Sequence, residues 1–333
     1  MIFHPAVIAL LVSSVAITGL VLYSAGLGVT ILRRWDLASG SELQLALERR
    51  TYLVSTILTN AFAFQLVSLF LLVFTADRLH TQFVGAMCAS GTLNADPSGY
   101  PALLLKLITF FLAGLWLVAN HVDTQAWDYP LVRFKYAALL LLAPVLLVEL
   151  LIQGDYLLSL EPNVITSCCG SLFTSDAHGV AADLAALPAR PTAIAFFAVL
   201  ISTCLAGLGF RLWGRGGFLV ALLSAASLVV SLAAMISFIS PFVYEMPSHH
   251  CPFDVLQGGY NWIGYPLYLL LGGGTLAGMG VGLLAPFRRI PSLRRVAPQI
   301  QRRLALASAT LLALFLALVV WLILSSDLRL LGA

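Results

Sequence analysis

The sequence predicts an all-α polytopic membrane protein, a bundle of about eight transmembrane helices. Its residues are 60% hydrophobic and only 10% charged, whereas soluble domains carry roughly 25% charged residues. The apolar residues also come in runs of about 20, the length with which a helix crosses roughly 30 Å of hydrocarbon. A helix satisfies its own backbone hydrogen bonds in lipid, and the runs lack the alternation that is typical of barrel strands.

The expected spans form a single transmembrane domain, residues 1–333, with no soluble domain of any size. Positive charges follow the first apolar run and do not precede it, which is typical of a retained anchor rather than a cleaved signal peptide. The spans cover roughly residues 6–32, 52–77, 101–121, 134–157, 191–212, 217–241, 262–287 and 304–325.

The basic residues predict the orientation of the chain in the cell membrane. Most of the 18 lysines and arginines lie in the connections after the first, third, fifth and seventh spans, which share one side of the bilayer. Positive residues favour the cytoplasmic side, so both termini are expected to be extracytoplasmic. No basic patch with interleaved aromatic residues indicates nucleic-acid binding.

Three outward loops are longer than a turn requires, and loops of such length are often functional. They cover roughly residues 78–100, 158–190 and 242–261, and we expect them to form a small lid over the bundle.

Four of the five cysteines lie in these outward loops: Cys88 in the first, Cys168 and Cys169 in the second, and Cys251 in the third. An even number of cysteines in an oxidising compartment commonly forms disulfides. Adjacent cysteines rarely meet disulfide geometry, so we expect Cys168 and Cys169 each to pair with Cys88 or Cys251. In this interpretation the cysteines only staple the loops together.

The residues beside these cysteines support a second interpretation, a metal site. Thiolate, thioether and imidazole groups together suit soft or borderline metals such as Cu(I) or zinc. No pair of cysteines has the C-x₂-C spacing of a zinc finger. The metal hypothesis takes as ligands Cys88, Cys168, Cys169, His249, His250 and Cys251, with Met87 and Met246 as weaker ligands.

A third interpretation is thiol–disulfide chemistry. The stretch Cys251-Pro252-Phe253-Asp254 resembles, over four residues, the Cys-Pro-x-Cys core of thioredoxin-like oxidoreductases. The resemblance implies Cys251 as the attacking catalytic thiol. Because Asp254 stands where the second cysteine would be, the thiol that resolves the intermediate would have to be Cys168, Cys169 or Cys88, on another loop. A protonated histidine beside Cys251 would lower its pKa.

Ionisable residues inside spans are functional candidates by default. Lys106 lies in the third span, and Glu149 and Gln153 share one face of the fourth because they are four residues apart. We expect either a Lys106–Glu149 ion pair between these helices or a Lys106 side chain that snorkels to the outer interface.

Small residues recur in the seventh span, where Gly274, Gly278 and Gly282 are spaced by four. Such spacing permits close helix contact, and we expect it to serve packing inside the bundle.

Two classes of function remain open. In the first, the protein handles a soft metal such as copper, or thiol–disulfide equivalents, at the outer face, together with an extracytoplasmic metal or thiol carrier. In the second, it is a non-catalytic subunit or permease partner in a larger membrane complex, and the cysteines are structural. Haem is not expected, because no histidine lies in the middle of a span and the sequence has no C-x-x-C-H.

Overall fold

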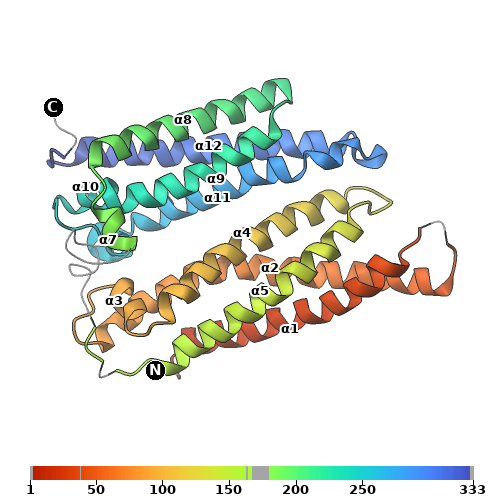
Figure 1. Cartoon of the computed structure of the whole chain (residues 1–333), viewed down its shortest axis with the longest axis horizontal. Coiled ribbons are helices and arrows are strands. Elements are labelled where there is room, and N and C mark those ends of the chain that lie inside the picture. The colour runs from red at the N-terminus through yellow and green to blue at the C-terminus, as the bar shows by residue number, and fades with distance from the viewer. Residues whose placement is uncertain (1–2, 38, 163, 167–179, 331–333) are drawn as a thin grey trace. The chain divides into compact units, whose positions relative to one another are not determined.

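The computed structural model describes residues 3–37, 39–162, 164–166 and 180–330 of the chain. Within this part, eight helices are long and apolar enough to cross a membrane (Figure 1). The described residues contain no strand, only one isolated bridge between Val84 and Ile165. The prediction of an all-α polytopic membrane bundle is confirmed.

The helices follow the apolar runs of the sequence. The long ones are α1 (Pro5–Arg34), α2 (Glu42–Leu79), α4 (Gly99–Asp123), α5 (Val132–Ser159), α8 (Ala189–Trp213), α9 (Gly217–Ala234), α11 (Gly264–Leu283) and α12 (Val296–Ser325). The short helices are α3 (Ala89–Asn94), α7 (Val180–Ala185) and α10 (Ser240–Tyr244), and the single turns are η1 (His80–Gln82), η2 (Met235–Ile239), η3 (Asp254–Leu256), η4 (Gly258–Tyr260), η5 (Pro286–Arg289) and η6 (Pro291–Leu293).

Two long helices begin well before their apolar runs. Helix α2 begins at Glu42 and α12 at Val296, whereas the apolar runs predict spans from about residues 52 and 304. The helical backbone continues because a turn outside the hydrocarbon still gains from satisfying its own N–H and C=O groups. Helix length therefore exceeds the length that lies in lipid.

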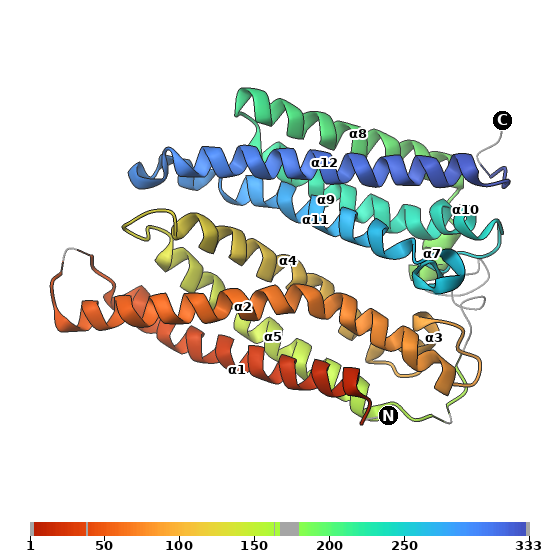
Figure 2. The same cartoon turned by 180° about the vertical axis from the view of Figure 1, so that it is seen from behind.

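The first of two compact units comprises Met1–Thr75, Asp96–Pro162 and Phe287–Ala297. In it, α1, α2, α4 and α5 run side by side (Figures 1 and 2). Their apolar faces meet in one core cluster in which Phe62 and Trp116 pack edge to face, with ring centroids 5.0 Å apart.

The second unit comprises Ala76–Ala95, Asn163–Pro286 and Pro298–Ala333. Helix α11 packs tightly in it because glycines stand where side chains would collide. A Cβ on Gly278 would lie 1.9 Å from Ser224 Oγ of α9 and 2.8 Å from Ser308 Oγ of α12. Similar close contacts face Gly274 and Gly282, so the glycine stripe serves packing within the chain.

The sixth span is interrupted in a way that shapes the loop after it. Residues Met235–Ile239 form a π-helical turn just before Pro241. In such a turn the N–H of residue i+5 would bond to the carbonyl of residue i, but Pro241 has no N–H to offer Ile236. The Nδ1–H of His250 donates to the Ile236 carbonyl oxygen at 2.8 Å. The loop that carries His250 is thereby anchored to the end of the span.

The glycine packing generates a prediction for stability. Gly278→Ala should lower the free energy of unfolding by about 1–3 kcal/mol, because the added methyl overpacks the α9–α11–α12 contact. Gly273→Ala is the matched control, since its Cβ would meet only Leu311 Cδ1 at 3.4 Å. Thermal unfolding in detergent measures both. Equal transition temperatures for the two variants would contradict this account of the packing.

Candidate functional site

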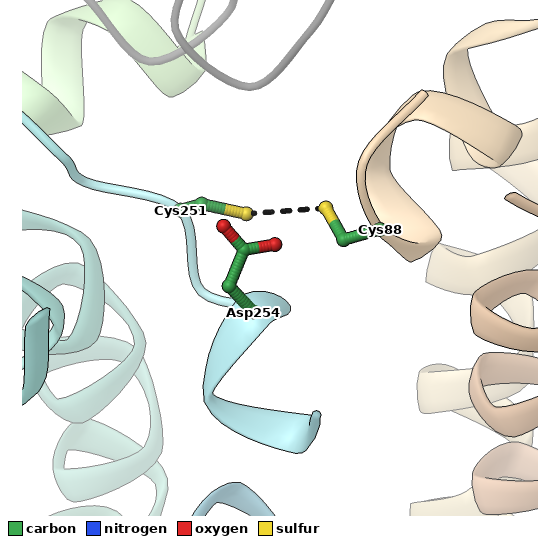
Figure 3. Close-up of side chains that lie close together, drawn as sticks. All are labelled: Cys88, Cys251 and Asp254. Carbon is green, nitrogen blue, oxygen red and sulfur yellow. Dashed lines mark hydrogen bonds between the residues drawn. The ribbon is translucent and has the colours of Figure 1, made fainter. Parts of the chain in front are cut away.

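Two cysteines from distant parts of the sequence meet in the second unit (Figure 3). Cys88 Sγ and Cys251 Sγ lie 3.6 Å apart, and both side chains are fully buried. The carboxylate of Asp254 lies beside them, and the three ligand atoms are all within 4.8 Å of one another. We refer to Cys88, Cys251 and Asp254 as the Cys₂Asp cluster.

Local backbone geometry in the first loop positions Cys88. It is the N-cap of α3, and its carbonyl oxygen accepts from the backbone N–H of Gly91 at 3.1 Å. The loop turns sharply at Gly85, whose φ of +89° lies in a region that L side chains rarely adopt. The Thr166 hydroxyl donates to the Gly91 carbonyl at 2.9 Å, and the Thr166 backbone N–H donates to the Val84 carbonyl at 3.0 Å. These bonds hold the second loop against the first.

Two tyrosines fix the backbone around Cys251. The hydroxyl of Tyr244 donates to the Cys251 carbonyl at 2.6 Å, and that of Tyr268 donates to the Pro252 carbonyl at 2.6 Å. The backbone N–H of Phe253 points at the sulfur itself, at 3.4 Å.

Asp254 is held from one side only. His249 Nε2 donates to Oδ2 at 2.6 Å, and the imidazole ring packs edge to face on Tyr244 at 4.5 Å. The other oxygen, Oδ1, is buried and has no hydrogen-bond partner within the part of the chain that the structure describes. Leaving such a group unsatisfied costs about 1–3 kcal/mol. Burial raises the pKa of the nearby Tyr260 phenol, and the negative charges of Asp254 and Cys251 raise it further.

A further side chain ties the first and third loops together. Gln257 donates from its amide nitrogen to the Met87 carbonyl at 2.8 Å and to Asp77 Oδ1 at 3.2 Å. Apolar groups, including Ala185 and Ile236, pack against the two cysteines. The cluster therefore lies in a rigid, dry setting built from both loops.

The structure gathers only part of the ligand set that the sequence suggested. His249 bonds to Asp254, and His250 bonds to a carbonyl in the sixth span, so neither ring lies in the three-residue group. Met87 and Met246 are 63% and 50% exposed. The predicted ligands, disulfide partners and resolving thiols Cys168 and Cys169 lie outside the described residues.

Sequence reasoning missed Asp254 as a ligand. The available signal was its position: it stands three residues after Cys251, where the resemblance to the Cys-Pro-x-Cys core places a second sulfur. The proximity of Cys88 to Cys251, across 163 residues, had no local signal at all.

The intramembrane polar residues converge in the first unit. Lys106 Nζ lies 2.5 Å from Glu149 Oε1, and both side chains are buried. Lys106 therefore pairs with an acid and does not snorkel. Gln65 of α2 donates to both carboxylate oxygens of Glu149, at 3.0 and 2.8 Å.

Helix α1 joins the same polar network through Ser14. Gln153 donates from its amide nitrogen to Ser14 Oγ at 3.1 Å, and Lys106 Nζ lies 3.4 Å from that oxygen. All four long helices of the unit thus contribute to one buried set of charge-assisted hydrogen bonds.

A second buried ion pair, absent from the sequence-based prediction, closes the other end of α4 and α5. Lys135 Nζ lies 2.6 Å from Asp123 Oδ2 and donates to Asn120 Oδ1 at 2.7 Å. Lys135 also lines a cavity of about 360 Å³ together with Trp35, Thr59 and other residues of the same unit. Lys135 follows the third span, among the basic residues that predict the orientation of the chain, but its side chain is buried inside the unit.

The Lys106–Glu149 pair generates a prediction. Lys106→Met should lower the free energy of unfolding by about 3–5 kcal/mol, because it leaves the Glu149 carboxylate buried without a counter-charge. Adding Glu149→Gln should recover much of that loss, since the amide is neutral and can still bond to Gln65. Denaturation in mixed micelles measures the series. A double variant no more stable than the single one would contradict the assignment.

Comparison with known proteins adds no family. No protein-family model matches the chain, and no curated protein and no solved structure matches it either.

Proposed function

We propose that this membrane protein binds a thiophilic metal ion at the Cys₂Asp cluster and handles that metal at the outer face of the cell membrane. One observation carries the proposal: among the described residues, the buried Asp254 Oδ1 has no hydrogen-bond partner, and it lies beside two buried sulfurs. A buried anionic oxygen needs a cation or a proton. A metal ion supplies the cation and binds both sulfurs as well.

The spacing of the sulfurs supports a metal. A tetrahedral zinc ion with Zn–S bonds of about 2.3 Å places two sulfur ligands about 3.8 Å apart. Cys88 Sγ and Cys251 Sγ lie 3.6 Å apart. A disulfide bond would bring them to about 2.05 Å.

The third ligand bears on which metal is bound. A carboxylate oxygen is an ordinary zinc ligand, whereas Cu(I) is selected by sulfur ligands. Zinc should therefore use all three groups, and copper should depend mainly on the two cysteines. His249 would hold the Asp254 carboxylate in place, as outer hydrogen bonds do around ligating groups.

The same sulfur contact supports a second candidate function, thiol–disulfide exchange between Cys88 and Cys251. Forming that bond releases two protons and two electrons, which the disulfide of a partner would have to accept. Burial counts against exchange with an external thiol, because reactive redox cysteines are accessible to solvent and both of these side chains have no exposed surface. Metal binding is therefore the function that the geometry favours.

Metal titration tests the proposal. The reduced, chelator-stripped protein in detergent should bind one zinc ion in competition with a chromophoric chelator. Cys88→Ser and Cys251→Ser should abolish that binding, and His249→Gln should weaken it about 10–100-fold. Affinity should fall as the pH falls, because protons compete for the two thiols and the carboxylate.

Cys204→Ser is the matched control, since Cys204 lies in α8, outside the cluster, and its sulfur contacts the Ala309 carbonyl. It should leave the zinc affinity unchanged. Asp254→Asn should weaken zinc more than Cu(I), which separates the two metals. Zinc binding that survives Cys251→Ser would refute the site. A Cys88–Cys251 disulfide that resists mild reductant and leaves no zinc binding would instead support cysteines that only staple the loops.

The orientation is part of the proposal and has its own test. With the native cysteines replaced by alanine, Met246→Cys should react with a membrane-impermeant maleimide on intact cells. Trp127→Cys, in the connection between α4 and α5, should react only after permeabilisation. This pattern follows from the excess of arginine in the connections on that side. The reverse pattern would place the cluster on the cytoplasmic side.

A further inference from the structure

At the end of the second unit opposite the Cys₂Asp cluster, three arginines gather around one hollow. Arg211 from the last turn of α8 and Arg302 and Arg303 from α12 line it, together with Gln299, and its volume is about 370 Å³. Gln299, Arg302 and Arg303 are three and four residues apart, so they share one face of α12.

Tight packing one turn away forces these charges together. A Cβ on Gly207 of α8 would lie 3.1 Å from the Ala305 carbonyl oxygen and 3.2 Å from the Ala309 Cβ of α12. Arg211 follows Gly207 by one helical turn, and Arg302 precedes Ala305 by less than one. The close contact between small residues thus brings guanidinium groups of both helices to a common place.

The helices of the unit from α8 to α12 supply no acid to neutralise them. The sequence has no aspartate or glutamate in α8, α9, α10, α11 or α12. None of the ion pairs formed among the described residues includes Arg211, Arg302 or Arg303. Like charges held together without a counter-ion repel one another, so the arrangement calls for an anion from outside the chain.

Apolar side chains adjoin the charges on the membrane side. Leu208 precedes Arg211 by three residues on α8, and Leu306 follows Arg302 by four on α12. Both leucines are exposed. A ligand in the hollow would therefore meet guanidinium groups at one end and apolar surface about one turn deeper. A free phosphate ion has no apolar part to contact the leucines. A phospholipid has both an anionic headgroup for the arginines and acyl chains for the apolar surface.

We propose that this hollow is a binding site for an anionic phospholipid. Arginine matches a phosphate with paired N–H donors, and basic pockets between transmembrane helices are suited to anionic headgroups. The acyl chains would lie along Leu208 and Leu306. The site is separate from the Cys₂Asp cluster and does not depend on metal binding.

Native mass spectrometry of the detergent-solubilised protein tests this site with phosphatidylglycerol as the probe. The wild type should retain one phosphatidylglycerol and not phosphatidylcholine, which carries the same phosphate without net charge. Arg302→Gln and Arg211→Gln should each weaken retention about fivefold, and salt should weaken it further. Arg302→Lys should lose less than Arg302→Gln, because it keeps the charge and loses only the paired donors.

Arg215→Gln is the matched control, because Arg215 lies at the same end of the unit but does not line the hollow. It should retain phosphatidylglycerol as the wild type does, and the thermal transition of each variant shows that it is folded. Equal losses in Arg215→Gln and Arg302→Gln would reduce the effect to general surface charge and overturn the site. Displacement of the lipid by millimolar inorganic phosphate would show a free-anion site and overturn the lipid assignment.

Discussion

The structure depends on one constraint of the bilayer: a polar group removed from water must find its partner within the protein. Lys106 and Glu149 satisfy this constraint by pairing with each other, and Gln65 satisfies it by donating to the same carboxylate. Pro241 cannot donate an N–H to the Ile236 carbonyl oxygen. His250, from the loop after the helix, donates to it instead. Each partner that satisfies a buried group also fixes the position of the element that carries it.

Two places where this constraint is not met among the described residues are where we expect ligands. Asp254 has one satisfied oxygen and one orphaned oxygen, and the orphan lies beside two sulfurs. Arg211, Arg302 and Arg303 have donors but no acidic partner among the ion pairs of the described residues. The first arrangement is rich in negative charge and soft atoms and suits a metal cation. The second is positive and bordered by leucines, and it suits an anionic lipid.

The two compact units use polar residues in different ways. In the first, both lysine–acid pairs are complete and lie between α4 and α5, one near each end of the helix pair. Such pairs specify how helices align more than they add stability, because desolvation offsets much of the attraction. In the second, glycine contacts align the helices. Tyr244 of α10, Tyr268 of α11 and Gln257 donate hydrogen bonds to the backbone of the loops that carry the cluster.

The sequence by itself determined the helical membrane fold, because the length and apolarity of a span are local properties that need no knowledge of neighbours. It also identified Lys106 and Glu149 as residues needing partners, and Cys88 and Cys251 as unusual loop residues. Only the tertiary structure decided that these two cysteines meet, that Asp254 joins them, and that His249 and His250 support the site from outside it. Contacts across 163 residues depend on how helices and loops pack, and nothing in the residues adjacent to either cysteine encodes that distance.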